Sequence, residues 1–383
     1  MNSNMKIRTI TAGFNYKSKS EEQDFEKIGI FLNKIRKEFE NNNYIVQTIR
    51  ASTQPWDNYF KSKNQIIDLV RNFEIYSKKF NIDYFNIGPT YNNENISFIY
   101  DIIKNTSIGF CTSHLSNGNK INHDGIKKTA KLIKRLSKIN YDGFANLRFA
   151  ALFNVKPGCP FYPSSFHNGN SQSFSIGLEN SDLVYKAFSA SRKIETASYY
   201  LNKILTREFK KIESLCKTIS KKEKIIYGGI DPSISPSVNP KESLAYAFEK
   251  LEIDKFGYPG TLSIAQIITE TIKNLKIKKC GYCGLMLPVL EDYGLSERNN
   301  EGIFNITNLL IYSTVCGTGL DTIPLPGDVS DKTIYSLLLD IATLSNKLDK
   351  PLSARLMPIP NKKKGEMTDY KFSYFVNSKI MNI

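Results

Sequence analysis

Segments with the hydrophobic spacing of β-strands alternate with helix-like segments along almost the whole chain, and this alternation limits the fold more than any other feature. In the first 219 residues it predicts strands at 7–13, 44–50, 84–87, 108–111, 147–152 and 174–178, and helices at 25–41, 64–80 and about 182–219. In the remainder it predicts strands at 225–230, 285–289, 322–325 and 354–357, and helices at 241–251, 262–275, 304–316 and 333–348. Strands joined by crossover helices pair in parallel, so an α/β protein is predicted.

No internal repeat and no linker rich in Pro, Gly or Ser interrupts the alternation. A chain of 383 residues is long enough for one large α/β domain and can bury most of its surface without disulfide bonds. We therefore expect a single integrated α/β domain over residues 1–383, for which a barrel is one arrangement. The ligand site is expected at the C-terminal ends of the strands, where parallel α/β folds bind their ligands.

The net charge of +15 is concentrated in the N-terminal part of the chain. Residues 1–225 contain 35 Lys or Arg and 20 Asp or Glu, whereas residues 226–383 contain 17 of each. In the helix-like stretch 124–138, basic residues surround an apolar face at helical spacing, which is typical of a solvated amphipathic helix. Arginine is scarce and no nucleic-acid motif is present, so no nucleic-acid partner is expected.

The apolar content and the cysteines indicate the cellular compartment in which the protein is expected. No stretch approaches the ~20 apolar residues of a membrane span, and residues 1–11 contain no apolar signal segment, so no membrane association is expected. The six cysteines are irregularly spaced, which favours reduced thiols in the cytoplasm. Cys280 and Cys283 form an isolated C-x-x-C, for which a structural role is favoured over zinc or redox chemistry. A homodimer is a reasonable expectation for a cytoplasmic enzyme.

Loops rich in Gly, Pro and polar side chains follow most of the predicted strands from residue 146 onward. They read NVKPGCPFYPSSFH at 154–167, SIGLE at 175–179, YGGIDPSISP at 227–236, GTLS at 260–263, CGYCGLMLPVLED at 280–292, DTIPLPGD at 321–328 and SARLMPIP at 353–360. Packing alone does not require so many of these residue types. The loops are therefore predicted to build a functional cleft.

Through these loops the chain resembles the domain-of-unknown-function 711 family, also called uncharacterised protein family 0210, over nearly its whole length. The family is similar in fold to the ten-stranded α/β barrel of pyruvate formate-lyase and anaerobic ribonucleotide reductase. The resemblance implies a single large α/β barrel with a central cleft. Residues 1–145 would form a basic N-terminal half of that barrel, and residues 146–383 would carry the cleft. It implies no particular reaction, because function lies in the site and not in the fold.

The chain departs from glycyl radical enzymes in two places. Those enzymes carry a glycine in an RVxGY-like loop near the C-terminus, whereas the tail here reads KGEMT at 364–368. Their two adjacent cysteines are absent, since Cys280 and Cys283 are separated by two residues. We therefore expect no glycyl radical chemistry.

Cys159 and His167 lie in the loop at 154–167 and are candidates for catalysis. Cys159 follows the basic residue Lys156 and precedes His167 by eight residues. A nearby cation would stabilise its thiolate as a nucleophile. The alternative is that Cys159 is a small buried side chain without a chemical role. His167 would act as an acid or base, or would only pack in its loop.

Acidic residues lie at or just beyond several predicted strand ends. Glu179, Asp231 and Glu291 are candidates for acid–base catalysis, and ion pairs, turns or helix caps are the alternative for each. Converging carboxylates repel one another unless a cation neutralises them, and Arg355 is a candidate for that role. We expect the loops that hold Cys159, Glu179, Asp231, Glu291 and Asp321 to meet in one pocket.

A divalent cation is the other way to neutralise such a cluster. The predicted ligands are Glu291, Asp292 and Asp321. Their hard oxygen atoms favour magnesium, calcium or manganese over zinc. Glycine-rich turns could also present backbone N–H groups to an anionic cofactor or ligand, without matching a P-loop or dinucleotide motif. The residues expected to do so are Gly228, Gly229 and Thr261.

Three functions remain open on the sequence. The first is an enzyme that acts on a small polar metabolite by acid–base or metal-assisted chemistry in a barrel cleft. The second is a small-ligand-binding or regulatory protein that has the same fold but no catalysis. The third and least expected is nucleic-acid binding through the basic N-terminal half.

Overall fold

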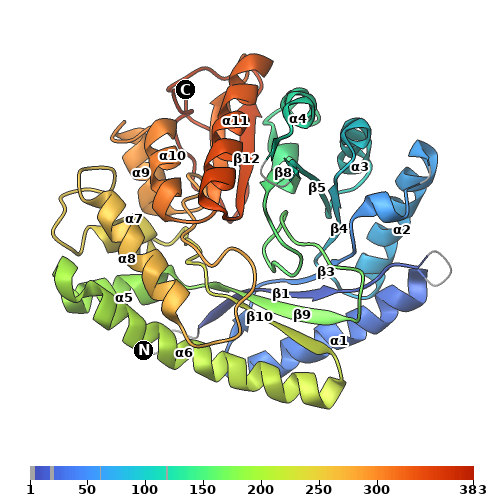
Figure 1. The fold of residues 1–383 in the computed structure, drawn as a ribbon, viewed down its shortest axis with the longest axis horizontal. Coiled ribbons are helices and arrows are strands. Elements are labelled where there is room, and N and C mark those ends of the chain that lie inside the picture. The colour runs from blue at the N-terminus through green and yellow to red at the C-terminus, as the bar shows by residue number, and fades with distance from the viewer. Residues whose placement is uncertain (1–4, 18–20, 61, 118–119) are drawn as a thin grey trace.

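The computed structural model describes residues 5–17, 21–60, 62–117 and 120–383, and it contains one large sheet surrounded by helices (Figure 1). The sheet has ten strands, with nine in the order β10–β9–β1–β3–β4–β5–β8–β12–β11 and β2 paired to β1. They are β1 (Lys6–Gly13), β2 (Ile45–Val46), β3 (Ile49–Ser52), β4 (Tyr84–Thr90), β5 (Gly109–His114), β8 (Phe149–Phe153), β9 (Ser173–Glu179), β10 (Ile226–Asp231), β11 (Gly319–Pro326) and β12 (Leu352–Ile359). A separate hairpin pairs β6 (Ser116–Asn117) with β7 (Lys120–Ile121).

The strands run in two opposite directions, which the predicted α/β alternation did not reveal. Strands β1, β3, β4, β5 and β8 are mutually parallel. Strand β9 is antiparallel to β1, and β12 is antiparallel to β8. Strand β10 is parallel to β9, and β11 is parallel to β12. The predicted mostly parallel sheet is thus confirmed, but it consists of a central set of strands between two outer pairs that run the other way.

The predicted closed barrel is not confirmed, because the described residues form no ladder between the edge strands β10 and β11. The chain around residues 278–289, where a strand at 285–289 was predicted, lies beside them without forming one. Cys280 N donates to Ile230 O at 3.0 Å, and Met286 N donates to Ile234 O at 3.0 Å. Thr318 Oγ1, just before β11, donates to Leu285 O at 3.2 Å. The prediction of a strand there was wrong, since Gly281 turns the chain at a φ of 71° and Pro288 has no N–H to donate.

The helices lie on the outside of the sheet (Figure 1). They are α1 (Glu21–Asn41), α2 (Lys63–Lys79), α3 (Ile99–Lys104), α4 (His123–Leu136), α5 (Ser181–Ser191), α6 (Ile194–Glu223), α7 (Leu244–Phe248), α8 (Thr261–Asn274), α9 (Tyr293–Asn300), α10 (Ile306–Val315) and α11 (Asp331–Leu348). Short 3-10 turns occur at Trp56–Asn58, Asn93–Phe98, Phe144–Arg148 and Pro240–Glu242. The single helix predicted over 182–219 is two helices, because Arg192 adopts a φ of 58° and ends α5.

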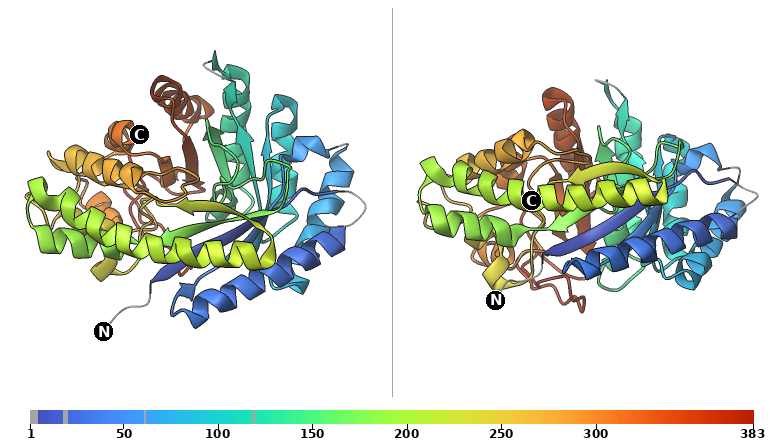
Figure 2. Two further views of the ribbon diagram at one scale, coloured as in Figure 1. Left: turned by 60° about the horizontal axis from the view of Figure 1, so that its bottom comes forward. Right: turned by 90° about the horizontal axis from the view of Figure 1, so that it is seen from below.

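The hydrophobic core lies between these helices and the sheet. Helix α1 buries Phe25, Ile28, Leu32 and Ile35 at helical spacing. Helices α1 and α6 lie side by side, as Figure 2 shows, and exposed ion pairs join them. Lys34 pairs with Glu223 at 2.7 Å, and Lys222 pairs with Glu38 at 2.8 Å. Each fully buried Leu, Ile or Phe contributes about 1.5–3 kcal/mol, so burial dominates over surface pairs worth about 0–1 kcal/mol each. No described helix is long and apolar enough to cross a membrane.

A loop after β8 fills the concave side of the sheet. We call residues 154–167 the interior loop. Thr11 Oγ1 donates to Pro160 O at 2.7 Å, and Asn86 Nδ2 donates to Pro163 O at 2.5 Å. His167 N donates to Thr53 O at 2.9 Å. These contacts hold the loop against β1 and β4 and the residues just beyond β3, and they place its segment 161–164 deep inside the molecule.

Candidate functional site

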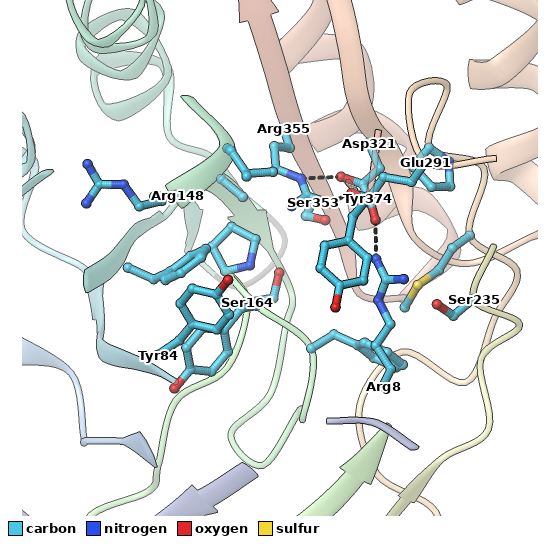
Figure 3. A pocket seen from close by; sticks show the side chains of 18 of the residues that line it. Arg8, Tyr84, Arg148, Ser164, Ser235, Glu291, Asp321, Ser353, Arg355 and Tyr374 are labelled. Atoms are coloured by element: carbon cyan, nitrogen blue, oxygen red, sulfur yellow. Dashed lines mark hydrogen bonds and ion pairs between the residues drawn. The ribbon is translucent and has the colours of Figure 1, made fainter. Parts of the chain in front are cut away.

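A cavity of about 190 Å³ lies beside the interior loop and is the candidate functional site (Figure 3). Its walls come from the central strands, the outer strands β11 and β12, the interior loop and the C-terminal segment. Both polar and aromatic side chains line it, a combination typical of small-molecule sites. The charged side chains in its lining are Arg8, Arg50, Arg148, Glu291, Asp321 and Arg355.

The cavity lies at the N-terminal ends of the central strands, whereas the sequence predicts a ligand site at their C-terminal ends. Arg8 is the third residue of β1, Arg50 is the second of β3, and Tyr84 is the first of β4. Because β9 runs antiparallel to β1, Glu179 at the end of β9 lies opposite Lys6 at the start of β1. The opposite ends of β1 and β3 are covered by the interior loop. Sequence reasoning therefore missed Arg8, Arg50 and Tyr84, and the only signal for them was a charged or aromatic residue near the start of a buried strand.

Five charged residues form the network beside the cavity. We call Arg8, Glu179, Glu291, Asp321 and Arg355 the arginine–carboxylate network. Glu291 bridges two arginines: its Oε2 lies 2.5 Å from Arg8 Nη2, and its Oε1 lies 2.7 Å from Arg355 Nη2 (Figure 3). Arg355 Nε also donates to Asp321 Oδ1 at 2.6 Å. Three of the predicted site residues, Glu291, Asp321 and Arg355, thus meet at the cavity.

Glu179 joins this network but does not line the cavity. Arg8 Nη1 lies 3.2 Å from its Oε2, and Lys6 Nζ lies 2.9 Å from its Oε1. Gln47 Nε2 donates to it at 2.7 Å. Burial alone would raise the pKa of Glu179, but Arg8, Gln47 and Lys6 together lower that pKa below its ordinary value. Glu179 therefore carries a buried negative charge that holds the Arg8 guanidinium through an ion pair.

A β-bulge aims Asp321 at the cavity. The register between β11 and β12 shifts between Leu320 and Ile323, so that Asp321 and Thr322 both lie opposite Arg355. Thr322 has a φ of 43°, a conformation that is rare for a β-branched residue. Its buried Oγ1 has no hydrogen-bond partner among the described residues. Such local strain concentrates at functional sites and persists only where the surroundings enforce it.

Arg50, like Arg148, lines the cavity without a carboxylate partner among the described residues. Within the described ranges no acid lies at ion-pair distance from it, and its Nε donates to Thr48 Oγ1 at 2.9 Å. Its guanidinium carbon lies 4.9 Å from the ring centre of Tyr162 and 5.6 Å from that of Tyr84. Burial lowers the pKa of Arg50 to about 10, so it remains charged at neutral pH. Stacking on two rings leaves its terminal nitrogen atoms available to a ligand.

Arg148 differs from Arg50 although both line the cavity. Its guanidinium points away from the other labelled side chains (Figure 3) and donates to backbone carbonyls. Nη2 donates to Ile103 O at 2.7 Å, and Nη1 donates to Gly109 O at 3.0 Å. These contacts tie the 3-10 turn before β8 to the end of α3 and to β5. Arg148 is therefore a structural contact of the cavity wall.

Hydroxyl groups complete the polar lining. Tyr282 OH donates to Ser164 Oγ at 2.5 Å and lies 2.9 Å from Ser353 Oγ. Burial raises the pKa of Tyr282, so its hydroxyl stays protonated. The chain of hydroxyls connects the interior loop with the start of β12. It gives the cavity neutral hydrogen-bonding groups beside its charged ones.

Asp231 lies outside the cavity and binds backbone amides. Its Oδ1 accepts from Ser233 Oγ at 2.6 Å and Cys283 N at 3.1 Å, and its Oδ2 accepts from Tyr282 N at 2.8 Å. A Cβ added to Gly281 would come within 2.0 Å of this carboxylate, so the turn requires glycine. Burial raises the pKa of Asp231 against these hydrogen bonds. Asp231 thus holds the turn at 280–284 against β10, and Cys280 and Cys283 flank that turn as free thiols.

Asp292 follows Glu291 directly but faces away from the cavity. It caps α9 by accepting from Leu295 N at 3.1 Å. It also accepts from Leu244 N at 2.6 Å and from Ser243 Oγ at 2.7 Å at the start of α7. The predicted metal ligands Glu291, Asp292 and Asp321 are therefore not brought to one point. The described part of the chain contains no group of three His, Cys, Asp or Glu arranged to hold a metal ion.

Cys159 and His167 are buried in the interior loop and do not line the cavity. Burial raises the pKa of the Cys159 thiol well above its ordinary value, with Asp231 Oδ2 4.0 Å from its sulfur. His167 Nδ1 accepts from Gly169 N at 3.1 Å, and Nε2 lies 3.1 Å from Ser171 O. Burial lowers the pKa of His167. The predicted meeting of loops occurs in part: the loops that hold Cys159, Asp231, Glu291 and Asp321 all contribute residues to the cavity, whereas the loop of Glu179 does not. Cys159 and Asp231 themselves are not among the lining residues.

The predicted anion-binding turns also lie away from the cavity lining. A Cβ on Gly229 would lie 2.8 Å from Lys278 O, so this glycine permits close approach of the neighbouring segment. Gly228 has similar crowding against Phe174 O at 3.2 Å. Thr261 begins α8, and its hydroxyl donates to Tyr258 O at 2.8 Å and accepts from Gly257 N at 2.9 Å. Their backbone contacts account for all three residues.

Together the fold and the cavity define an α/β protein with a charged, aromatic-lined site at the N-terminal ends of its central strands. The chain belongs to the family described as Uncharacterised ACR (DUF711), whose model matches residues 1–372. This confirms the family that the loops indicated. The similarity to the pyruvate formate-lyase barrel stays a prediction.

Several relatives that match this chain are named UPF0210 proteins. One from Pyrobaculum aerophilum is 28% identical over 257 residues, which cover 65% of this chain and 56% of the relative. One from Acetivibrio thermocellus is 25% identical over 260 residues, covering 65% and 58%. One from Clostridium perfringens is 24% identical over 325 residues, covering 80% and 72%. The chain spans little more than half the length of the first two relatives.

Proposed function

We propose that the cavity is the active site of an enzyme that acts on a small organic anion. The observation that carries the proposal is the pairing of two incompletely satisfied groups in one cavity. Arg50 has a guanidinium without a carboxylate partner, and Asp321 has a carboxylate oxygen, Oδ2, that receives no hydrogen bond from a described residue. A substrate that supplies the missing acceptor and donor would satisfy both.

Arg50 is proposed to bind the anionic group of the substrate. A guanidinium presents its N–H groups in a planar fork that matches a carboxylate or phosphate. The stacking of Arg50 on Tyr162 and Tyr84 holds the plane of that fork. Partial burial makes the resulting charge-assisted hydrogen bonds stronger than they would be in water.

Asp321 is proposed to transfer a proton to or from the bound substrate. Its Oδ1 is held by Arg355, which leaves Oδ2 for the substrate. Glu291 has both oxygens occupied by Arg8 and Arg355, so it is assigned as a positioning residue. The strained bulge at Thr322 supports the proposed role of Asp321, because a regular strand would not pair Asp321 and Thr322 with one residue.

A protein that binds the same anion without converting it is the alternative. It would use Arg50 in the same way but would have no need for an acid with a free oxygen beside the ligand. The two functions therefore differ in the effect expected from Asp321→Asn. In a binding protein that variant changes only affinity, whereas in the enzyme it abolishes conversion.

The test is equilibrium dialysis of the purified protein against a defined mixture of monocarboxylates, dicarboxylates and phosphate monoesters, followed by NMR of the retained and converted compounds. Wild-type protein is expected to retain at least one acid. Arg50→Gln should weaken that binding about 10- to 100-fold, the loss expected from hydrogen bonds to a charged group. Arg71→Gln, at an exposed arginine of α2, is the matched control and should bind as wild type. Equal retention by Arg50→Gln and wild type would refute the anion site.

A further inference from the structure

The aromatic side chains of the cavity walls indicate the shape of the ligand, in addition to its charge. We infer that the anion is an aromatic carboxylate, with a flat ring that lies between two aromatic walls. This inference rests on the proposed function, because it takes Arg50 as the binding group for the carboxylate. It adds the shape of the substrate, which Arg50 alone does not specify.

The first wall surrounds Arg50. Phe110 lies edge-on to Tyr84, with ring centres 5.5 Å apart, and edge-on to Tyr162, with ring centres 5.0 Å apart. All three side chains line the cavity. Tyr162 belongs to the interior loop, and its hydroxyl donates to Ala51 O at 2.5 Å. The guanidinium and the rings of this wall thus form one rigid surface.

The second wall comes from the C-terminal segment. Phe372 and Tyr374 line the cavity, with ring centres 5.5 Å apart. Phe372 also packs edge-on against Phe144, at 5.1 Å. Arg8 lies over the Tyr374 ring, with its guanidinium carbon 5.7 Å from the ring centre. Val376 N donates to Leu290 O at 2.8 Å, which fastens this segment beside the arginine–carboxylate network.

Both walls retain partly exposed ring surface. Tyr84, Phe144, Phe372 and Tyr374 are all half-buried, whereas core rings such as Phe25 are fully buried. Figure 3 shows the rings of Tyr84 and Tyr374 among the cavity side chains. Aromatic rings favour stacked or edge-to-face contact with another ring over contact with a saturated group. A flat ring in the cavity would satisfy both walls.

The charges of the cavity favour one negative charge on the ligand. The arginine–carboxylate network contains three acids and two arginines, and Lys6 joins it through Glu179 while also pairing with Glu242 at 2.7 Å. With Lys6 and Glu242 included, the cluster holds four acids and three cations, so it offers no uncompensated positive charge to a ligand. Arg148 is engaged by backbone carbonyls, which leaves Arg50 as the ligand-facing cation among the described lining residues. A single carboxylate matches that cation, whereas a dianionic phosphate would exceed it.

The experiment is isothermal titration of the purified protein with benzoate, cyclohexanecarboxylate and inorganic phosphate. Benzoate is expected to bind about tenfold more tightly than cyclohexanecarboxylate, since two ring contacts of ordinary strength distinguish the two acids. Phosphate should bind more weakly than benzoate. Tyr374→Leu should reduce the preference for benzoate to about threefold or less. Tyr141→Leu, at an exposed tyrosine outside the cavity, should leave the preference unchanged.

The outcomes separate this inference from the proposed function. If benzoate and cyclohexanecarboxylate bind equally and Arg50→Gln weakens both, the anion site stands and the aromatic ligand is refuted. If phosphate binds more tightly than either acid in an Arg50-dependent way, the carboxylate is refuted. If no acid binds, or if Arg50→Gln binds all of them as wild type does, both proposals fail.

Discussion

The turn around Asp231 and the cavity around Glu291 compensate a buried carboxylate with different groups. Each contains a buried carboxylate: Asp231 at the end of β10, and Glu291 just before the N-cap of α9. Asp231 is satisfied by backbone amides and one hydroxyl, whereas Glu291 is satisfied by two arginine side chains. A carboxylate bound to backbone amides holds a chain segment in one conformation. A carboxylate bound to arginines at a cavity leaves charged groups where a ligand reaches them.

The neighbouring residues Glu291 and Asp292 repeat this difference within one dipeptide. Asp292 binds the amides at the starts of α7 and α9, and Glu291 binds Arg8 and Arg355 at the cavity. Both are acids, both are buried and both follow the same loop. Residue type and position along the chain therefore do not separate a structural acid from a cavity acid. The two kinds of acid differ in the groups that bind them, which are backbone amides for Asp292 and arginine side chains for Glu291.

The largest effect is expected at the amide-bound acid. Asp231→Ala leaves several buried donors unsatisfied and opens a cavity, so the free energy of unfolding should fall by about 3–5 kcal/mol. Urea denaturation followed by circular dichroism measures this loss. Asp328→Ala, at an exposed acid in a loop after β11, is the matched control and should change stability by less than about 0.5 kcal/mol. A small effect at Asp231 would remove the distinction between the two regions.

Glu291→Ala should cost less, about 2 kcal/mol, although it removes contacts to two arginines. Arg8 keeps Glu179 and Arg355 keeps Asp321, so neither guanidinium is left without an acid. The same denaturation measurement applies. A loss as large as that of Asp231→Ala would contradict the view that the network shares its charges.

The two regions should also respond to pH in opposite directions. The pKa of Glu179 is lowered in the folded state, so its stabilisation is present above its unfolded pKa of about 4.3 and is lost as the pH falls through the folded pKa. The pKa of Asp231 is raised, so its contribution grows as the pH falls. Glu179→Gln should therefore flatten the loss of stability below about pH 5. If this variant loses stability at acid pH as steeply as the wild type, Glu179 does not stabilise the fold through the network.

The smallest effect is expected at the bulge beside Asp321. Thr322→Gly should raise the free energy of unfolding by up to about 1 kcal/mol, because glycine adopts a positive φ without strain and the unpartnered hydroxyl is removed. Thr112→Gly is the matched control, since Thr112 is a buried strand threonine that also lacks a hydroxyl partner but has no positive φ. It should lose about 1 kcal/mol or more. Equal losses at both positions would show that Thr322 is not strained.

Much of the local structure follows from the sequence, and the exceptions have local causes. The helices at 25–41 and 64–80 lie within one to four residues of α1 and α2, because apolar spacing and capping are properties of neighbouring residues. The strand predicted at 285–289 does not form, since Pro288 has no N–H to donate and the chain turns at Gly281 before this segment. Glu291, Asp321 and Arg355 were recognised as site candidates because polar side chains in glycine- and proline-rich loops stand out. Cys159, His167 and Asp231 were grouped with them for the same reason, although the structure buries them elsewhere.

The family, the alternation of elements and the loops that supply the acids can be read from the amino-acid sequence, because each of these depends on residues close together in the chain. Tertiary structure alone decided which strand ends form the cavity and which cation each acid meets. Strand direction is set by pairing between distant segments, so the antiparallel pairing of β1 with β9 places Glu179 opposite Lys6 at the start of β1. Arg8 and Glu291 are 283 residues apart in the chain and in contact in the fold. The spacing of neighbouring residues cannot predict that contact, because the contact arises only when the whole sheet has assembled.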